Sequence, residues 1–256
     1  MNTVLITGAS GGIGKEFAYI FAKEKYNLIL VARSKDKLDS LARELKEKYK
    51  TEVNIFVSDL SNPKSPKKLY EQIKNENITI NVLVNNAGFG DYGKFTDGDL
   101  QKYIQMINLN ITALTELTGL FIKDMIQRNE GRILNVASTA AFQPMPNFAV
   151  YAATKSYVLN FTEALHYELR NTGIIVSALC PGPTTTGFKD AANIEDSKLF
   201  KSGVMDAKTV AAIGFKQFMK NKMTIIPGVR NKILAFASNT SPSRKVLVTV
   251  SNWISK

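Results

Sequence analysis

The sequence has few cysteines, few histidines and no long apolar run. Cys180 is the single cysteine and His166 the single histidine among 256 residues, which excludes an internal disulfide framework and a cysteine-rich metal site. No apolar run approaches the roughly 18 residues that indicate a membrane span, and the N-terminus lacks the basic leader of a secretory signal. We therefore expect a soluble, cytoplasmic protein without a metal centre, folded as a single domain over residues 1–256.

Acidic residues are scarce towards the C-terminus. The formal net charge is +11, and residues 201–256 contain ten Lys or Arg residues but one acid, Asp206. The basic C-terminal extension 229–256 also carries apolar residues. It could contact an anionic membrane surface or an acidic carrier protein, and packing across the domain or a second subunit is the favoured alternative. No recognition motif or aromatic stacking pattern accompanies the charge, so we expect no nucleic-acid partner.

Short apolar runs alternate with longer amphipathic or charged stretches along most of the chain. Apolar strands that alternate with helices favour a parallel sheet covered on both faces, and right-handed crossovers make such a sheet doubly wound. The sequence therefore predicts an α/β fold, a Rossmann-like doubly wound parallel β-sheet with helices on both faces in three α/β/α layers. The predicted strands are residues 4–6, 28–31, 53–57, 82–84, 132–136, 174–179 and 224–226.

A glycine-rich turn, TGASGGIG, follows the first predicted strand at residues 7–14. Ligands of doubly wound sheets bind beyond the carboxyl ends of the strands, so this turn lies where a ligand is expected. Gly8, Gly12 and Gly14 would let the backbone approach a pyrophosphate, whose charge the following helix N-terminus would stabilise. Glycine turns also end strands for structural reasons alone. It is the position between a strand and a helix that predicts a dinucleotide site.

The end of the second predicted strand bears on which dinucleotide binds. The sequence there is VARSK at residues 31–35, so Arg33 stands where an acid would bind a ribose 2′-hydroxyl. A guanidinium suits a 2′-phosphate instead. Asp36 comes later, and its place at the start of the next helix accounts for it. We expect NADP(H) to be preferred over NAD(H), the alternative being that Arg33 is a solvated loop residue.

Tyr151 and Lys155 lie four residues apart in a stretch that is helical by pattern, so both side chains lie on one helix face. A neighbouring ammonium lowers the pKa of a phenol from about 10, which suits the phenol to exchange a proton with a carbonyl or alcohol. Ser138 follows the run 132–136, and its hydroxyl could bind a carbonyl oxygen where charge develops. Taken singly, such residues are more often surface decoration or part of a turn.

Together these motifs resemble the short single-domain branch of the short-chain dehydrogenase/reductase family, from residue 3 to about residue 227. Residues 85–88 (NNAG) are similar to the family's fourth-strand motif, and residues 181–186 (PGPTTT) to the segment that binds the nicotinamide carboxamide. The resemblance implies contacts to the cofactor from Gly8, Ser10, Gly12, Ile13, Gly14, Arg33, Asp59, Leu60, Asn86, Ala87, Gly88, Tyr151, Lys155, Pro181, Gly182, Thr184 and Thr186.

The same resemblance implies a catalytic set of Ser138, Tyr151, Lys155 and Asn108. In the family's pattern, Tyr151 would act as acid and base, and Lys155 would bind the nicotinamide ribose. Ser138 would position the carbonyl, and Asn108 would hold a water of the proton relay. The implied activity is hydride transfer between NADP(H) and a carbonyl or alcohol. A catalytically idle NADP(H)-binding sensor or scaffold on the same fold is the alternative.

The substrate and the assembly are less constrained. The loops beyond the strand ends carry many apolar residues, which favours a hydrophobic chain or ring on the small-molecule substrate, and residues 184–204 are expected to form a lid. The chain lacks the Asp-Gly-Gly turn after the last strand that helps many relatives form a tetramer, so we expect a homodimer. The apolar loop residues are Phe89, Tyr92, Phe95, Phe142, Pro144, Met145, Pro146, Phe188, Leu199 and Phe200.

Overall fold

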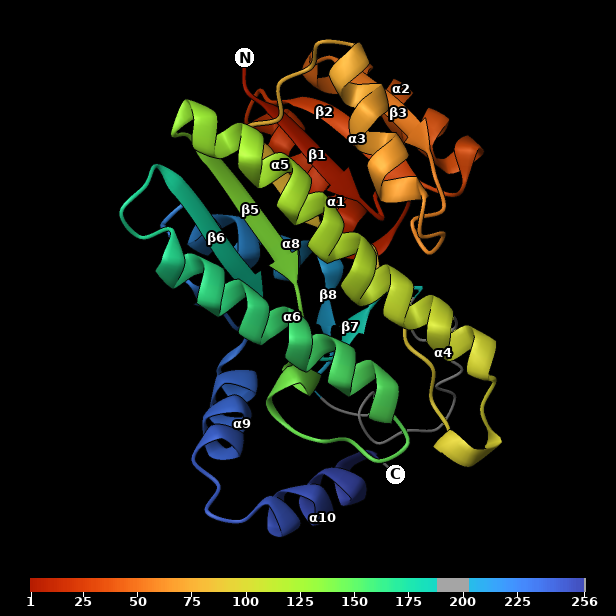
Figure 1. Ribbon diagram of the computed structural model, residues 1–256, viewed down its shortest axis with the longest axis vertical. Coiled ribbons are helices and arrows are strands. Elements are labelled where there is room, and N and C mark those ends of the chain that lie inside the picture. Colours follow the sequence, from red (N-terminus) through yellow and green to blue (C-terminus); the bar gives the residue numbers. More distant parts are fainter. Residues whose placement is uncertain (188–202, 256) are drawn as a thin grey trace.

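A parallel β-sheet forms the centre of the molecule (Figure 1). The computed structural model describes residues 1–187 and 203–255. Within these residues seven strands pair in the order β3-β2-β1-β4-β5-β6-β9, all in parallel. The strands are β1 (Thr3–Thr7), β2 (Asn27–Ala32), β3 (Val53–Val57), β4 (Val82–Asn85), β5 (Gly131–Val136), β6 (Ile174–Leu179) and β9 (Thr224–Ile225).

The central strands of the sheet are buried on both faces. Their successive side chains point to opposite sides of the sheet. In β1, Val4 and Ile6 belong to one core cluster, whereas Leu5 belongs to a second. The same alternation continues in β2, where Leu28 lies in the first cluster and Ile29 in the second. Continuous apolar runs therefore suit these strands, since neither face meets water.

Helices supply the other half of each cluster. On one face α1, α2 and α8 contribute apolar side chains, and on the other α3 and α5 do so, while α6 packs along β6 (Figure 1). This arrangement confirms the predicted three-layer, doubly wound fold. The helices are α1 (Gly12–Lys23), α2 (Lys35–Tyr49), α3 (Ser65–Asn75), α4 (Leu100–Ile107), α5 (Leu114–Arg128), α6 (Ala149–Glu168), α8 (Ala207–Phe218), α9 (Val229–Asn239) and α10 (Arg244–Ser255).

Several local features were not predicted from the sequence. A π-helical turn, η2 (Asn108–Ala113), joins α4 to α5. Two short strands, β7 (Thr184–Thr185) and β8 (Met205–Asp206), pair in parallel outside the main sheet. The expected lid at 184–204 lies mostly outside the described residues. Among the helices that the structure does describe, none is both long and apolar enough to cross a membrane.

Candidate active site

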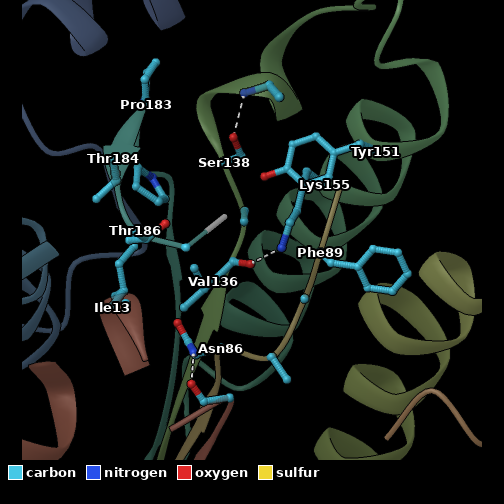
Figure 2. Close-up of a pocket in the computed structure, with 18 of the residues that line it drawn as sticks. Ile13, Asn86, Phe89, Val136, Ser138, Tyr151, Lys155, Pro183, Thr184 and Thr186 are labelled. Carbon is cyan, nitrogen blue, oxygen red and sulfur yellow. Dashed lines mark hydrogen bonds between the residues drawn. The ribbon is translucent and has the colours of Figure 1, made fainter. Parts of the chain in front are cut away.

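A cavity of about 590 Å³ lies beyond the carboxyl ends of the strands, where the sequence places the candidate residues. Its wall includes the segments that follow β1, β2, β3, β4, β5 and β6. Of the predicted cofactor and catalytic residues, all but Gly14 and Asn108 line it. Parallel strands bring these distant segments to one edge of the sheet. The tertiary structure therefore gathers the predicted residues into one site (Figure 2).

The glycine turn after β1 needs its glycines for two different reasons. Gly8 and Gly12 have φ values of +67° and +53°, a region that favours glycine. Gly14 instead lies so close to the turn that a Cβ atom would come within 2.4 Å of the Gly8 carbonyl oxygen. Gly14 thus packs the start of α1 against the turn and does not line the cavity. Next to them, a Cβ on Gly11 would meet no atom within 4 Å, which leaves backbone open to a ligand.

The end of β4 is held against the end of β1 by hydrogen bonds from the NNAG segment. The Asn86 side chain donates to the Thr7 carbonyl oxygen at 3.0 Å, and the backbone N–H groups of Asn86 and Ala87 both donate to the Thr7 hydroxyl. Asn85 turns into the core, where its amide donates to Asn135 at 2.9 Å and to Thr118 at 3.0 Å. These contacts fix the floor of the cavity.

Positive charge gathers at the end of β2. Arg33 lines the cavity here together with Ser34 and Lys37, and Lys37 was missed in the sequence, although it lies four residues after Arg33. Asp36 does not line the cavity and lies in the first turn of α2, as expected. Two cations and a hydroxyl at this point fit a 2′-phosphate. Together with the open glycine turn, they make the described residues a good fit to a dinucleotide.

Ser138, Tyr151 and Lys155 lie together at the end of β5 (Figure 2). Ser138 follows the strand, and its hydroxyl accepts a hydrogen bond from the Ala140 N–H at 3.1 Å. Tyr151 and Lys155 lie one turn apart on α6. Lys155 Nζ donates to the Val136 carbonyl oxygen at 2.8 Å and lies 5.9 Å from the centroid of the Tyr151 ring. The predicted triad therefore converges on one point of the cavity.

Burial shifts both titrating groups away from their charged forms. It raises the pKa of Tyr151 to about 12, and a hydrogen bond with Ser138 opposes that rise. Burial also lowers the pKa of Lys155 to about 8, with Cys180 acting in the opposite direction. The prediction that the ammonium acidifies the phenol is wrong for this arrangement, because Lys155 Nζ is directed to the carbonyl of Val136 and burial dominates.

The asparagine beside Lys155 is Asn110, whereas the sequence resemblance indicated Asn108. Asn108 is half-buried and does not line the cavity. Asn110 is 1% exposed, donates to the Phe89 carbonyl oxygen and the Thr154 hydroxyl at 3.0 Å each, and accepts from the Phe89 N–H. The π-helical turn η2, a feature often found at functional sites, carries this residue. The repeated pattern Asn-Leu-Asn could have indicated both candidates.

Apolar side chains form part of the cavity wall, and the C-terminal extension contributes to it. Phe89 and Met145 line it as predicted, and Phe148 and Leu234 join them. Of the other predicted substrate residues, Phe95 is 59% exposed and is absent from the lining, as are Tyr92, Phe142, Pro144 and Pro146. Phe188, Leu199 and Phe200 lie outside the described residues. The C-terminal extension therefore packs across the domain, which is one of the two arrangements that the sequence analysis favoured, and α9 forms part of the cavity wall.

Comparisons with known proteins agree with this geometry. A family model described as short chain dehydrogenase matches residues 2–197. The chain is 37% identical over 183 residues to very-long-chain 3-oxoacyl-CoA reductase of Homo sapiens, covering 69% of this chain and 57% of that protein. It is 31% identical over 252 residues to 17-beta-hydroxysteroid dehydrogenase type 3 of Mus musculus, covering 96% and 80%.

Among solved structures, the fold is similar to that of a short-chain dehydrogenase from Sphingobium yanoikuyae in complex with NADPH. The TM-score is 0.85 with 33% identity, and 93% of each chain is covered. The chain spans less than two thirds of the human reductase. The matched residues 2–197 nevertheless contain the glycine turn, the NNAG segment and the triad. The chain therefore belongs to the short-chain dehydrogenase family.

Proposed function

We propose that this protein transfers a hydride between NADP(H) and a carbonyl or alcohol substrate that carries an apolar chain or ring. The single observation that carries this proposal is the convergence of Ser138, Tyr151 and Lys155 in a glycine-lined cavity that fits a dinucleotide. Family membership supports the reaction class. When bound, the nicotinamide supplies the hydride, and the protein supplies placement and proton transfer.

Tyr151 is the proposed acid and base. Its pKa of about 12 keeps the phenol protonated near neutral pH, which suits donation of a proton to a carbonyl oxygen as charge develops there. Ser138 lowers the pKa of the phenol, against the effect of burial, and its hydroxyl would bind the same oxygen. The proposed role of Lys155 is to hold the sugar next to the nicotinamide, from the position that the Val136 carbonyl fixes.

Asn110 takes the supporting role in this proposal in place of Asn108. A Cβ atom on Gly88 would lie 2.9 Å from Asn110 Oδ1 and 3.4 Å from Lys155 Nζ, so the amide and the ammonium both lie close to this glycine. The amide also ties the Phe89 backbone to Thr154 of α6. We assign it the positioning of the β4 end relative to the helix that carries Tyr151 and Lys155.

The apolar part of the cavity wall supports an apolar substrate. Phe89, Met145, Phe148 and Leu234 belong to it. The names of two relatives point the same way, since one reduces very-long-chain 3-oxoacyl-CoA and the other is a 17-beta-hydroxysteroid dehydrogenase. The decisive assay is NADPH oxidation across ketones, steroid ketones and 3-oxoacyl thioesters of increasing chain length. Activity confined to short polar carbonyls would refute the substrate part of the proposal.

A homodimer in the cytoplasm completes the proposal. Leu100 and Ile104 of α4 and Tyr157 of α6 are exposed apolar or aromatic residues on helices next to the site, which suits contact with a second copy. The single cysteine, Cys180, is buried and unbridged, which is compatible with a reducing compartment. Light scattering of the purified protein and of Ile104→Glu tests the dimer, because the variant should dissociate into monomers.

A further inference from the structure

Two helices outside the sheet carry apolar stripes on their exposed faces. In α9 the stripe is Val229, Ile233 and Phe236, and in α10 it is Val246, Val250 and Trp253. Both sets follow the spacing i, i+4, i+7, which places each set on one side of its helix. All six residues are between 48% and 73% exposed. Apolar residues at helical spacing normally face a core, so we expect these exposed faces to contact another apolar surface.

The opposite faces of the same helices are already used. Asn231 and Ala235 of α9 are buried, and the Ser238 hydroxyl donates to Gln143 Oε1 at 2.8 Å. Leu247 and Ser251 of α10 are buried too, and the Ser251 hydroxyl donates to the Pro144 carbonyl oxygen at 2.6 Å. The helices are therefore docked on the domain, and the apolar stripes lie on the sides that this docking leaves exposed.

The charge of this region selects the partner. Residues 229–255 contain four basic residues and no acidic one, and of the four Lys232, Arg244 and Lys245 are exposed and lie outside the cavity lining. Amphipathic helices that combine exposed aromatic and aliphatic residues with lysine and arginine bind in the plane of an anionic lipid surface. A second copy of this chain would bring the same positive charge to the contact and would be repelled.

We propose that α9 and α10 form a docking surface for anionic lipid membranes. The surface consists of the two stripes with Lys232, Arg244 and Lys245, and it occupies the lower end of the molecule, opposite α3 (Figure 1). This inference goes beyond the proposed reaction and does not depend on it. Since Leu234 and Ala235 of α9 also line the cavity, the docking helix and the cavity wall are one element, and an apolar substrate could pass between bilayer and site.

Trp253 makes the test direct, because it is the only tryptophan in the chain and stands in the α10 stripe. The full chain is mixed with vesicles of phosphatidylcholine and phosphatidylserine in a 7:3 ratio, or with phosphatidylcholine alone. We expect sedimentation with the anionic vesicles and a blue shift of the tryptophan fluorescence, both weakened by added salt. Absence of sedimentation with the anionic vesicles at low salt would overturn the proposal, and equal sedimentation with both vesicle types would overturn its charge component.

Matched variants test whether vesicle binding depends on this surface, on the net charge of the protein or on an intact fold. The triple variant Lys232→Gln, Arg244→Gln, Lys245→Gln should lower the vesicle partition coefficient about 100-fold. Lys64→Gln, Lys67→Gln, Lys68→Gln, at exposed positions in and before α3, should leave it nearly unchanged. Equal losses in the two triple variants would refute this surface. Phe236→Ser with Val250→Ser should abolish the blue shift while NADPH oxidation continues, which shows that the fold is intact.

Two rival occupants give distinct results. If the two serine substitutions convert a dimer into a monomer and the parent protein does not bind vesicles, the surface is an interface between copies. If the parent protein binds an acidic carrier protein through the same lysines and arginine but ignores anionic vesicles, the partner is a protein. Either result overturns the membrane proposal. Because NADPH oxidation is measured separately, failure of docking is distinguishable from failure of the proposed reaction.

Discussion

Lys155 Nζ donates a 2.8 Å hydrogen bond to the carbonyl oxygen of Val136, the last residue of β5. This bond joins α6 to the sheet at the carboxyl edge and holds the ammonium 5.9 Å from the centroid of the Tyr151 ring. The charge is thereby held over the Tyr151 ring at a cation–π distance, while its hydrogen bond goes to the backbone of Val136. The pKa of Tyr151 is consequently governed by burial and by Ser138, and Lys155 is free to act on a sugar hydroxyl.

Replacing Tyr151 with phenylalanine removes the proposed proton donor and preserves the ring that packs against Phe148. We expect kcat to fall at least 1,000-fold, in the upper range of what general acid–base catalysis contributes, whereas the dissociation constant for NADPH changes less than twofold. Steady-state kinetics and fluorescence titration measure the two quantities. Tyr167→Phe, at an exposed position on the same helix, is the control. Turnover near that of the parent would remove the catalytic assignment and favour an idle NADP(H)-binding protein.

The two directions of the reaction should respond differently to pH. With the pKa of Tyr151 raised to about 12, the phenol required for reduction persists from pH 7 to 9, but the phenolate required for oxidation is scarce and grows with pH. At saturating cofactor we expect kcat for alcohol oxidation to rise about tenfold per pH unit over this range. The kcat for reduction should stay nearly flat. Parallel profiles in the two directions would contradict the assignment of Tyr151.

The buried ammonium of Lys155 should reduce stability at neutral pH. Its pKa falls from 10.5 to about 8, so between these values the unfolded chain binds more protons than the native one, and native stability increases as pH rises. The depression corresponds to about 3 kcal/mol. Lys155→Met removes this cost but also loses the hydrogen bond to Val136, which is worth about 1 kcal/mol. The variant should therefore raise the free energy of unfolding by about 2 kcal/mol at pH 7.

Urea denaturation between pH 7 and 9.5 checks this prediction. The gain from Lys155→Met should shrink as pH rises through 8, because the lysine of the parent protein then becomes neutral in the native state. Lys68→Met, at an exposed position of α3, is the matched control and should give no such trend. A gain that stays constant with pH would show that the native lysine is not the titrating group.

The cations at the end of β2 should set the cofactor preference. Arg33→Asp should lower kcat/KM for NADPH about 100-fold and raise it for NADH, because a carboxylate repels a 2′-phosphate and accepts a hydrogen bond from a 2′-hydroxyl. Lys37→Gln should lower kcat/KM for NADPH about fivefold without benefit to NADH. The ratio of the two kcat/KM values is the measurement. An unchanged ratio in Arg33→Asp would refute the preference for NADP(H).

Asn110 and Asn108 form a matched pair. Asn110→Ala leaves the Phe89 carbonyl oxygen and N–H without their partner inside the protein, so we expect a loss of about 2 kcal/mol in unfolding free energy and a fall in kcat that exceeds any change in KM. Asn108→Ala should behave like the parent in both assays. Losses confined to Asn108→Ala would restore the assignment made from the sequence.

Much of the fold could be predicted because the signal is local. The apolar runs of β3 and β6 have the same bounds in the sequence analysis and in the structure, since the signal of a strand depends on neighbours along the chain. The position of the site was predictable because the carboxyl ends of parallel strands lie at one edge of the sheet, and ligands bind there. The π-helical turn at 108–113 was not predicted, because it depends on where Asn110 finds hydrogen-bond partners in Phe89 and Thr154.

The sequence by itself determined the α/β fold, the glycine turn and the spacing of Tyr151 and Lys155, because these depend on residue type and periodicity. Tertiary structure decided how those groups behave. Burial raised the pKa of Tyr151 and lowered that of Lys155, and packing chose Asn110 over Asn108. Docking of α9 and α10 also decided which of their faces remained exposed. The dielectric environment of a buried group and its hydrogen-bond partners from distant parts of the sequence are set by the folded chain. The spacing of residues along the sequence does not specify them.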